Sequence, residues 1–141
     1  MNKLKLFLLI LFSQFLNSQS IIGAWEKYET NSDGITHRHI VIFSEGFKST
    51  SVFDSSNGKF ISTNGGSWFL DGSTLTEKIE FDTQDQEKVG STFKFELDIK
   101  ENTVTNINSR KTWNRIDDGS PGQLNGAWSV SYTHLRAHET Q

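Results

Sequence analysis

Cysteine is absent from this chain of 141 residues. Its absence excludes disulfide bonds, thiolate metal sites and a cysteine nucleophile. It also excludes a lipid anchor attached through a cysteine. The chain has the length of a single domain. Because no disulfide bond can form, packing and hydrogen bonding must stabilise that domain.

Long hydrophobic runs are also scarce, and the one that stands out is Leu6–Phe12 near the N-terminus. Lys3 and Lys5 precede it, and small polar residues follow it up to Ser20. This order is typical of a secretory signal peptide over residues 1–20; the alternative is a buried first helix. The run is too short to span a membrane, and no second run follows. We therefore expect a secreted or periplasmic protein that carries no transmembrane segment once the signal is removed.

An excess of basic charge is missing too. The chain holds 14 Lys and Arg against 17 Asp and Glu, for a formal net charge of −3. Nucleic-acid-binding domains usually present a basic face to the phosphates, so we expect no nucleic-acid partner. The acidic residues are scattered, and no acidic tail is present.

Helical periodicity is weak between residues 21 and 116. Runs rich in Ile, Val, Phe, Thr and Trp alternate instead with Gly, Asn and Asp turn signals, at 31–34, 44–46, 54–58, 64–66, 71–73, 100–102 and 108–109. Such spacing predicts eight or nine short antiparallel strands. The exception is one helical turn near residues 83–89, with Thr83 as its expected N-cap and Gln86 answering it.

Two strands show clear alternation. Between residues 91 and 100, every second residue is apolar: Phe93, Phe95, Leu97 and Ile99. Between residues 74 and 81, one face carries Leu75, Ile79 and Phe81, with Glu77 among them. Period two with one apolar face places that face in the core.

Short connections favour pairing of consecutive strands, which gives a meander. A meander of this length has two bare edges unless it closes into a barrel. The sequence therefore predicts an all-β protein with an antiparallel up-and-down barrel over residues 21–116.

The two ends of this region carry a further pattern. Gly23 and Trp25 open the first predicted strand, and Trp113 and Arg115 lie in the last. This pattern resembles the lipocalin-like barrels, whose first strand begins with Gly-x-Trp and whose last carries an Arg. The resemblance implies that Trp25 plugs one end of the barrel and that Arg115 stacks on its face, as a cation–π pair.

Five segments carry a narrower resemblance: GAWE, VIFSEGF, TNGGSWFLDGSTLTEKIEFDT, VGSTFKFEL and TWNRID. As a set they resemble secreted lipocalin-like proteins of Bacteroidetes, often described as membrane or secreted proteins or by a domain of unknown function. In that family a second barrel often follows the first. Residues 117–123 are therefore interpreted as a linker and residues 124–128, LNGAW, as the first strand of a truncated second repeat.

The residues after this strand do not continue the repeat. Residues 129–141 differ from the first copy, and Ser129–Thr140 resembles the translation of a transposase-type sequencing adapter. We interpret this tail as an artefact, so its two His residues carry no functional weight. A genuine strand or helix is the alternative.

Glu77 is the first candidate for a site, because a carboxylate on an apolar face is costly unless it is paired. It either accepts hydrogen bonds from an interior Arg, Lys or Tyr, or lines a cavity and binds a polar ligand group, or acts as a general acid or base. His37 and His39 share one face of their strand. They could chelate a metal with a third ligand such as Glu77, contact a ligand, or form a polar strip near a hairpin.

An eight-stranded barrel is just wide enough to be filled by side chains or to hold one small ligand. We expect a cavity at the barrel mouth walled by Trp68, Glu77, Phe93 and Phe95, with His37 or His39 near the rim. The leading interpretation is a non-enzymatic binding module for a small, partly apolar molecule. The alternatives are a cell-envelope structural or interaction domain with a packed interior, and an enzyme that uses Glu77 and a His. No serine-hydrolase, P-loop or dinucleotide motif is present, and we expect no cofactor and no metal.

Overall fold

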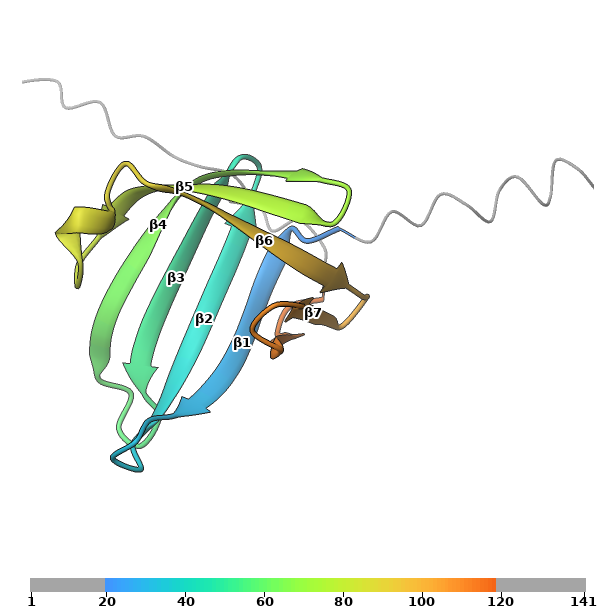
Figure 1. Ribbon diagram of the computed structural model, residues 1–141. Coiled ribbons are helices and arrows are strands. Elements are labelled where there is room, and N and C mark those ends of the chain that lie inside the picture. The colour runs from blue at the N-terminus through green and yellow to red at the C-terminus, as the bar shows by residue number, and fades with distance from the viewer. Residues whose placement is uncertain (1–19, 119–141) are drawn as a thin grey trace, which may run out of the picture.

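The computed structural model describes residues 20–118. The predicted second-repeat strand and the adapter-like tail lie outside this range, as do the predicted signal peptide except Ser20 and most of the predicted linker. Eight strands close into one antiparallel barrel in which each strand pairs with the next and β8 pairs with β1 (Figure 1). The predicted all-β up-and-down barrel is thus confirmed.

The strands follow one another with short connections. Their bounds are β1 Gly23–Thr30, β2 Thr36–Ser44, β3 Phe47–Asp54, β4 Phe60–Asp71, β5 Thr74–Asp82, β6 Thr92–Ile99, β7 Thr103–Asn106 and β8 Lys111–Arg115. One short 3-10 turn, η2 (Gln86–Lys88), lies between β5 and β6. The predicted helical turn is therefore present, but its N-cap is Asp85 rather than Thr83, because the Asp85 side chain accepts from the backbone N–H of Glu87.

Alternate residues of the strands point into the barrel and form its core. The buried cluster consists of Ile21, Trp25, Val41, Phe43, Leu75, Leu97 and Val104. Partly buried side chains on the same face pack against it, among them Trp68, Phe95 and Trp113. The alternation in β6, and in β5 as far as Ile79, thus has the predicted consequence of one face inside and one outside. The prediction is wrong for Phe81, which is 42% exposed because the register of β5 against β4 shifts before it.

One predicted turn is wrong. Asn64–Gly66 lies in the middle of β4, where the pairing with β5 shifts by one residue between Gly65 and Gly66. The two glycines mark a β-bulge and a close approach of neighbouring backbones rather than a hairpin. A methyl group on Gly66 would overlap the backbone oxygen of Lys78.

Because consecutive strands are antiparallel, successive connections lie at alternate ends of the barrel. One end holds the start of β1, the end of β8 and the connections at 45–46, 72–73 and 100–102. The other end holds the connections at 31–35, 55–59, 83–91 and 107–110, and is called the mouth below.

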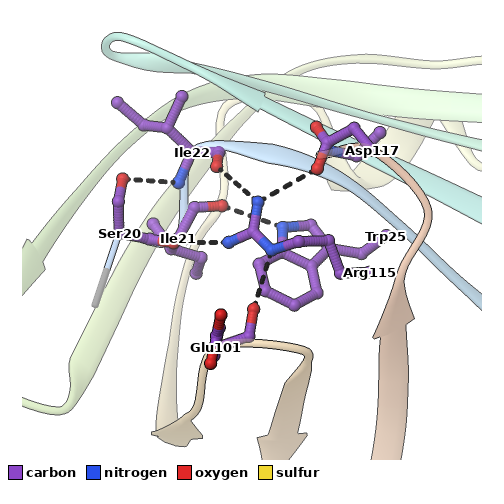
Figure 2. A network of polar contacts seen from close by, with 8 residues as sticks. Ser20, Ile21, Ile22, Trp25, Glu101, Arg115 and Asp117 are labelled. Atoms are coloured by element: carbon purple, nitrogen blue, oxygen red, sulfur yellow. Dashed lines mark hydrogen bonds and ion pairs between the residues drawn. The ribbon is translucent and has the colours of Figure 1, made fainter. Parts of the chain in front are cut away.

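Trp25 and Arg115 close the first of these ends (Figure 2). Trp25 is only 1% exposed, and its indole N–H donates to the backbone oxygen of Ile21 at 2.8 Å. The Arg115 guanidinium lies 4.0 Å from the Trp25 ring centroid. It also donates to the backbone oxygens of Ser20, Ile22 and Glu101 and pairs with Asp117. One side chain thus ties β8 to the N-terminal segment and to the β6–β7 connection.

We expect Arg115→Ala to destabilise the barrel by about 2–4 kcal/mol, because it removes the cation–π contact with buried Trp25, three hydrogen bonds to backbone oxygens and the Asp117 ion pair. Arg115→Lys should recover only part of this loss, since one ammonium cannot replace the branched guanidinium. Thermal unfolding of the two variants measures both effects. An unchanged melting temperature for Arg115→Ala would remove Arg115 from the closure of the barrel.

Candidate functional site

A cavity of about 170 Å³ lies inside the barrel. Most of its wall is apolar, from Trp25, Val41, Phe43, Leu75, Phe95, Leu97, Val104 and Trp113. Its polar lining comes from His39, Lys48, Thr50, Glu77 and Asn106. An apolar chamber with a few placed polar groups is the usual form of a small-molecule site.

Glu77 is held by a lysine from a neighbouring part of the barrel wall. The residue as a whole is 2% exposed, and both oxygens of its carboxylate accept from the Lys48 ammonium at 2.7 Å. The Lys48 side chain is itself only 13% exposed. Because a buried charge is tolerated when it is paired, this contact explains how Glu77 can lie on the apolar face of β5.

Three of the predicted ligand-binding residues, His39, Glu77 and Phe95, line the cavity. Trp25 and Trp113, which were assigned to barrel closure, line it as well.

Trp68, Phe93 and His37 are not part of the lining. Trp68 lies opposite Glu77 but packs edge-on against Phe43, with ring centroids 5.3 Å apart, and donates to the backbone oxygen of Ser44. It therefore packs against the buried core cluster next to Phe43 and is not itself part of the cavity wall.

Phe93 on β6 pairs with Glu77 on β5. The Phe93 ring stacks on the Phe95 ring, with centroids 6.4 Å apart. It is 38% exposed, so it lies at the entrance and not inside the chamber. His37 pairs with Glu29 near the start of β2 and occupies the mouth rim.

Four side chains on β1, β2 and β8 form an electrostatic cluster towards the mouth. The Glu29 carboxylate pairs with both Lys27 and Lys111, the latter at 2.6 Å. Hydrogen bonds from Lys111 and Lys27 lower the pKa of Glu29 to about 2, so this carboxylate stays ionised. Burial, with the nearby Lys27 charge, lowers the pKa of His39 to about 4, so its imidazole is neutral at neutral pH.

The buried, neutral His39 predicts a pH dependence of folding. Below pH 6.5 the unfolded chain protonates this imidazole, while the folded chain does not until about pH 4. The unfolded state therefore binds more protons, and stability falls as pH drops through this window by up to about 3 kcal/mol. Denaturant unfolding between pH 7 and 5 should show about 2 kcal/mol of this loss in the parent and a flatter profile in His39→Asn.

The neighbouring residue offers a matched control. His37→Asn keeps His39 and should keep the pH slope of the parent protein between pH 7 and 5. A His39→Asn profile as steep as the parent profile would contradict a neutral, buried His39.

The structure brings no third metal ligand to His37 and His39 among the described residues. Within residues 20–118, no three His, Cys, Asp or Glu side chains come together in a way that could hold a metal ion. In the same range, no helix has the length and apolar character needed to cross a membrane.

Sequence reasoning missed Lys48, Thr50 and Asn106 as lining residues. β3 alternates Lys48, Thr50 and Val52 on one face with Ser49, Ser51 and Phe53 on the other, so neither face is clearly apolar. Lys48 pairs with Phe43 on β2, whose side chain is buried in the core. Only this pairing shows that the face of β3 with Lys48 and Thr50 points into the barrel.

No protein-family model matches the chain, and neither do the curated proteins or the solved structures compared with it.

Proposed function

We propose that this protein is an exported, non-enzymatic binding module of the lipocalin-like kind that holds one small, partly apolar molecule inside its barrel. The observation that carries the proposal is the 170 Å³ cavity with an apolar wall and a few buried polar groups. An apolar cavity of about 150 Å³ is large enough to bind benzene. The expected ligand is thus about the size of one ring with one substituent.

The arrangement of Glu77 favours binding over catalysis. Both carboxylate oxygens are occupied by Lys48, which favours a carboxylate that holds the wall together. Phe93, exposed at the entrance, supports the entry of an apolar ligand.

Tryptophan fluorescence tests the proposal, because Trp25 and Trp113 both contact the cavity. Titration of the full chain with benzene or toluene should change the emission and saturate. Thr50→Phe fills the chamber from β3 and should abolish the change. Ser49→Phe, the same kind of substitution on the outer face of β3, should retain it. A parent protein whose emission does not respond and that purifies with no small molecule would contradict the proposal.

A second function, an envelope interaction module, is favoured by the outer surface of the barrel. Ile42, Phe47, Phe69 and Ile116 are between 42% and 60% exposed. Ile42 is paired with Ala24, and Phe47 with Ser67, two residues from Phe69. Ile116, just after β8, donates its backbone N–H to Ala24, so these side chains lie around one outer region of β1–β4. Capture of an envelope protein that is lost in Phe47→Ser but kept in Thr50→Phe would support this function instead.

A further inference from the structure

The two walls of the cavity differ in character, and the cationic side is the mouth half of β1, β2, β7 and β8. In register, Lys27 lies opposite His39, and Asn106 lies opposite Lys111. The Lys27 ammonium also lies 5.1 Å from the centroid of the Trp113 ring on β8. Five groups that can donate hydrogen bonds therefore meet on one stretch of inner wall. Three of them, His39, Asn106 and Trp113, line the cavity, and the two lysines lie beside that lining.

This stretch carries one uncompensated positive charge. Lys27, only 9% exposed, and Lys111 share a single carboxylate, that of Glu29. His39 adds no charge near neutral pH. The other interior lysine, Lys48, is neutralised by Glu77. Lys48 pairs with Phe43 on β2, whereas Lys27 pairs with His39 on the same strand. Phe43 and His39 are four residues apart, which is about 14 Å along β2.

Two donors on this wall are without acceptors. Trp113 Nε1 is buried and has no hydrogen-bond partner within residues 20–118. The Asn106 side chain uses its oxygen to accept from the backbone N–H of Ser109, and its Nδ2 group donates to none of the described residues. A buried donor without an acceptor costs about 1–3 kcal/mol, so an acceptor that reaches Trp113 after a small ring movement recovers that cost.

On β5 and β6 an apolar stretch of the lining lies next to the Lys48–Glu77 ion pair. Leu75 and Phe95 pair with each other across β5 and β6 and line the chamber. Phe93 extends this apolar surface to the entrance. A ligand that satisfies both walls has a compact apolar ring on one side and a single negative group on the other.

We propose that the cavity selects small organic monoanions, with an apolar ring against Leu75 and Phe95. The carboxylate or similar group lies against Trp113 and Asn106, within the field of the nearby Lys27 ammonium. This inference rests on the proposed binding function and adds the charge class of the ligand. The excess ammonium charge attracts the anion, and the unpaired donors fix its orientation.

Benzoate, benzamide and benzamidine test the inference, because they share one shape and carry a charge of −1, 0 and +1. Titration of the full chain by tryptophan fluorescence and calorimetry should give benzoate an affinity about tenfold above that of benzamide, with benzamidine weakest. Raising the salt concentration should weaken benzoate binding and leave benzamide binding unchanged.

Variants locate the charge that makes the difference. Lys27→Met keeps the apolar stem of the side chain and should lower the affinity for benzoate to about the affinity for benzamide. Lys111→Met, whose side chain is 46% exposed, should reduce it without a risk to folding. Glu29→Gln should increase the preference. Lys100→Met, a change of an exposed lysine at the closed end, should leave it unchanged.

The outcomes separate the two proposals. Equal binding of benzoate and benzamide overturns the anion inference and leaves the binding function intact. A benzoate preference that survives in both lysine variants also overturns it. Failure of benzoate, benzamide and benzene alike to bind contradicts the binding function itself.

Discussion

Lys48→Met is expected to destabilise the barrel by about 3–5 kcal/mol, because it leaves the Glu77 carboxylate buried without a partner. Glu77→Gln should cost less. The flexible Lys48 stem can carry its ammonium towards water once the partner is gone, whereas the shorter Glu77 side chain is 3% exposed and cannot. Urea unfolding of both variants measures this asymmetry.

The double variant Lys48→Met/Glu77→Leu provides the control. Replacing both charges with apolar groups of similar size removes the desolvation penalty together with the attraction. Most of the stability lost in Lys48→Met should therefore return. Two single variants within about 0.5 kcal/mol of the parent would show that the pair is solvated in solution.

Gly66→Ala is expected to cost more than about 4 kcal/mol or to prevent folding. At this position in β4 a Cβ atom would overlap the backbone oxygen of Lys78 and lie 2.7 Å from the backbone nitrogen of Glu80. Both atoms belong to the neighbouring strand β5, so the strands would have to separate at the bulge. The yield of folded protein, followed by urea unfolding, measures the effect.

Gly72→Ala separates this steric effect from the general cost of replacing a glycine. Gly72 has a left-handed backbone, with φ of 60°, but no atom lies within 4 Å of its added methyl group. The expected loss is about 1–2 kcal/mol. A Gly66→Ala variant no less stable than Gly72→Ala would show that β4 and β5 can separate at the bulge at little cost.

The two glycines of β4 also show where local sequence patterns fail. Asn-Gly-Gly is a strong turn signal, yet here it continues a strand of twelve residues. The contact that requires glycine comes from β3 and β5, whose backbones lie against Gly65 and Gly66. No local rule includes those neighbours.

The apolar run at the end of β2 was open to a similar misreading. Ile40–Phe43 suggests a strand covered on both sides, but Ile42 is 53% exposed on the outer face. Hydrophobicity alone does not distinguish a doubly covered strand from one with an exposed outer patch.

For the candidate site, the sequence marked Glu77 as anomalous and offered pairing with an interior Lys as one explanation. It could not identify Lys48, which is 29 residues away in the chain. It expected Glu77 and Phe95 in the cavity wall, where they lie, but also Trp68 and Phe93, which do not line the cavity. It expected His37 or His39 near the rim, whereas His39 lies in the lining. The error has a common cause: residues that point inward share a face, while their height along the barrel axis decides whether they seal an end, line the chamber or form the rim.

The all-β class, the closure of consecutive antiparallel strands into a barrel and most of the inward face could be predicted from the amino-acid sequence. These properties follow from period-two alternation and short turns, which are encoded within a few residues. The tertiary structure alone decided that Lys48 neutralises Glu77, that Lys27, Lys111 and Glu29 meet near the mouth, and that a cavity remains between the walls. Those properties depend on the register and stagger of strands distant in the chain, and on the volume left after every inward side chain has packed.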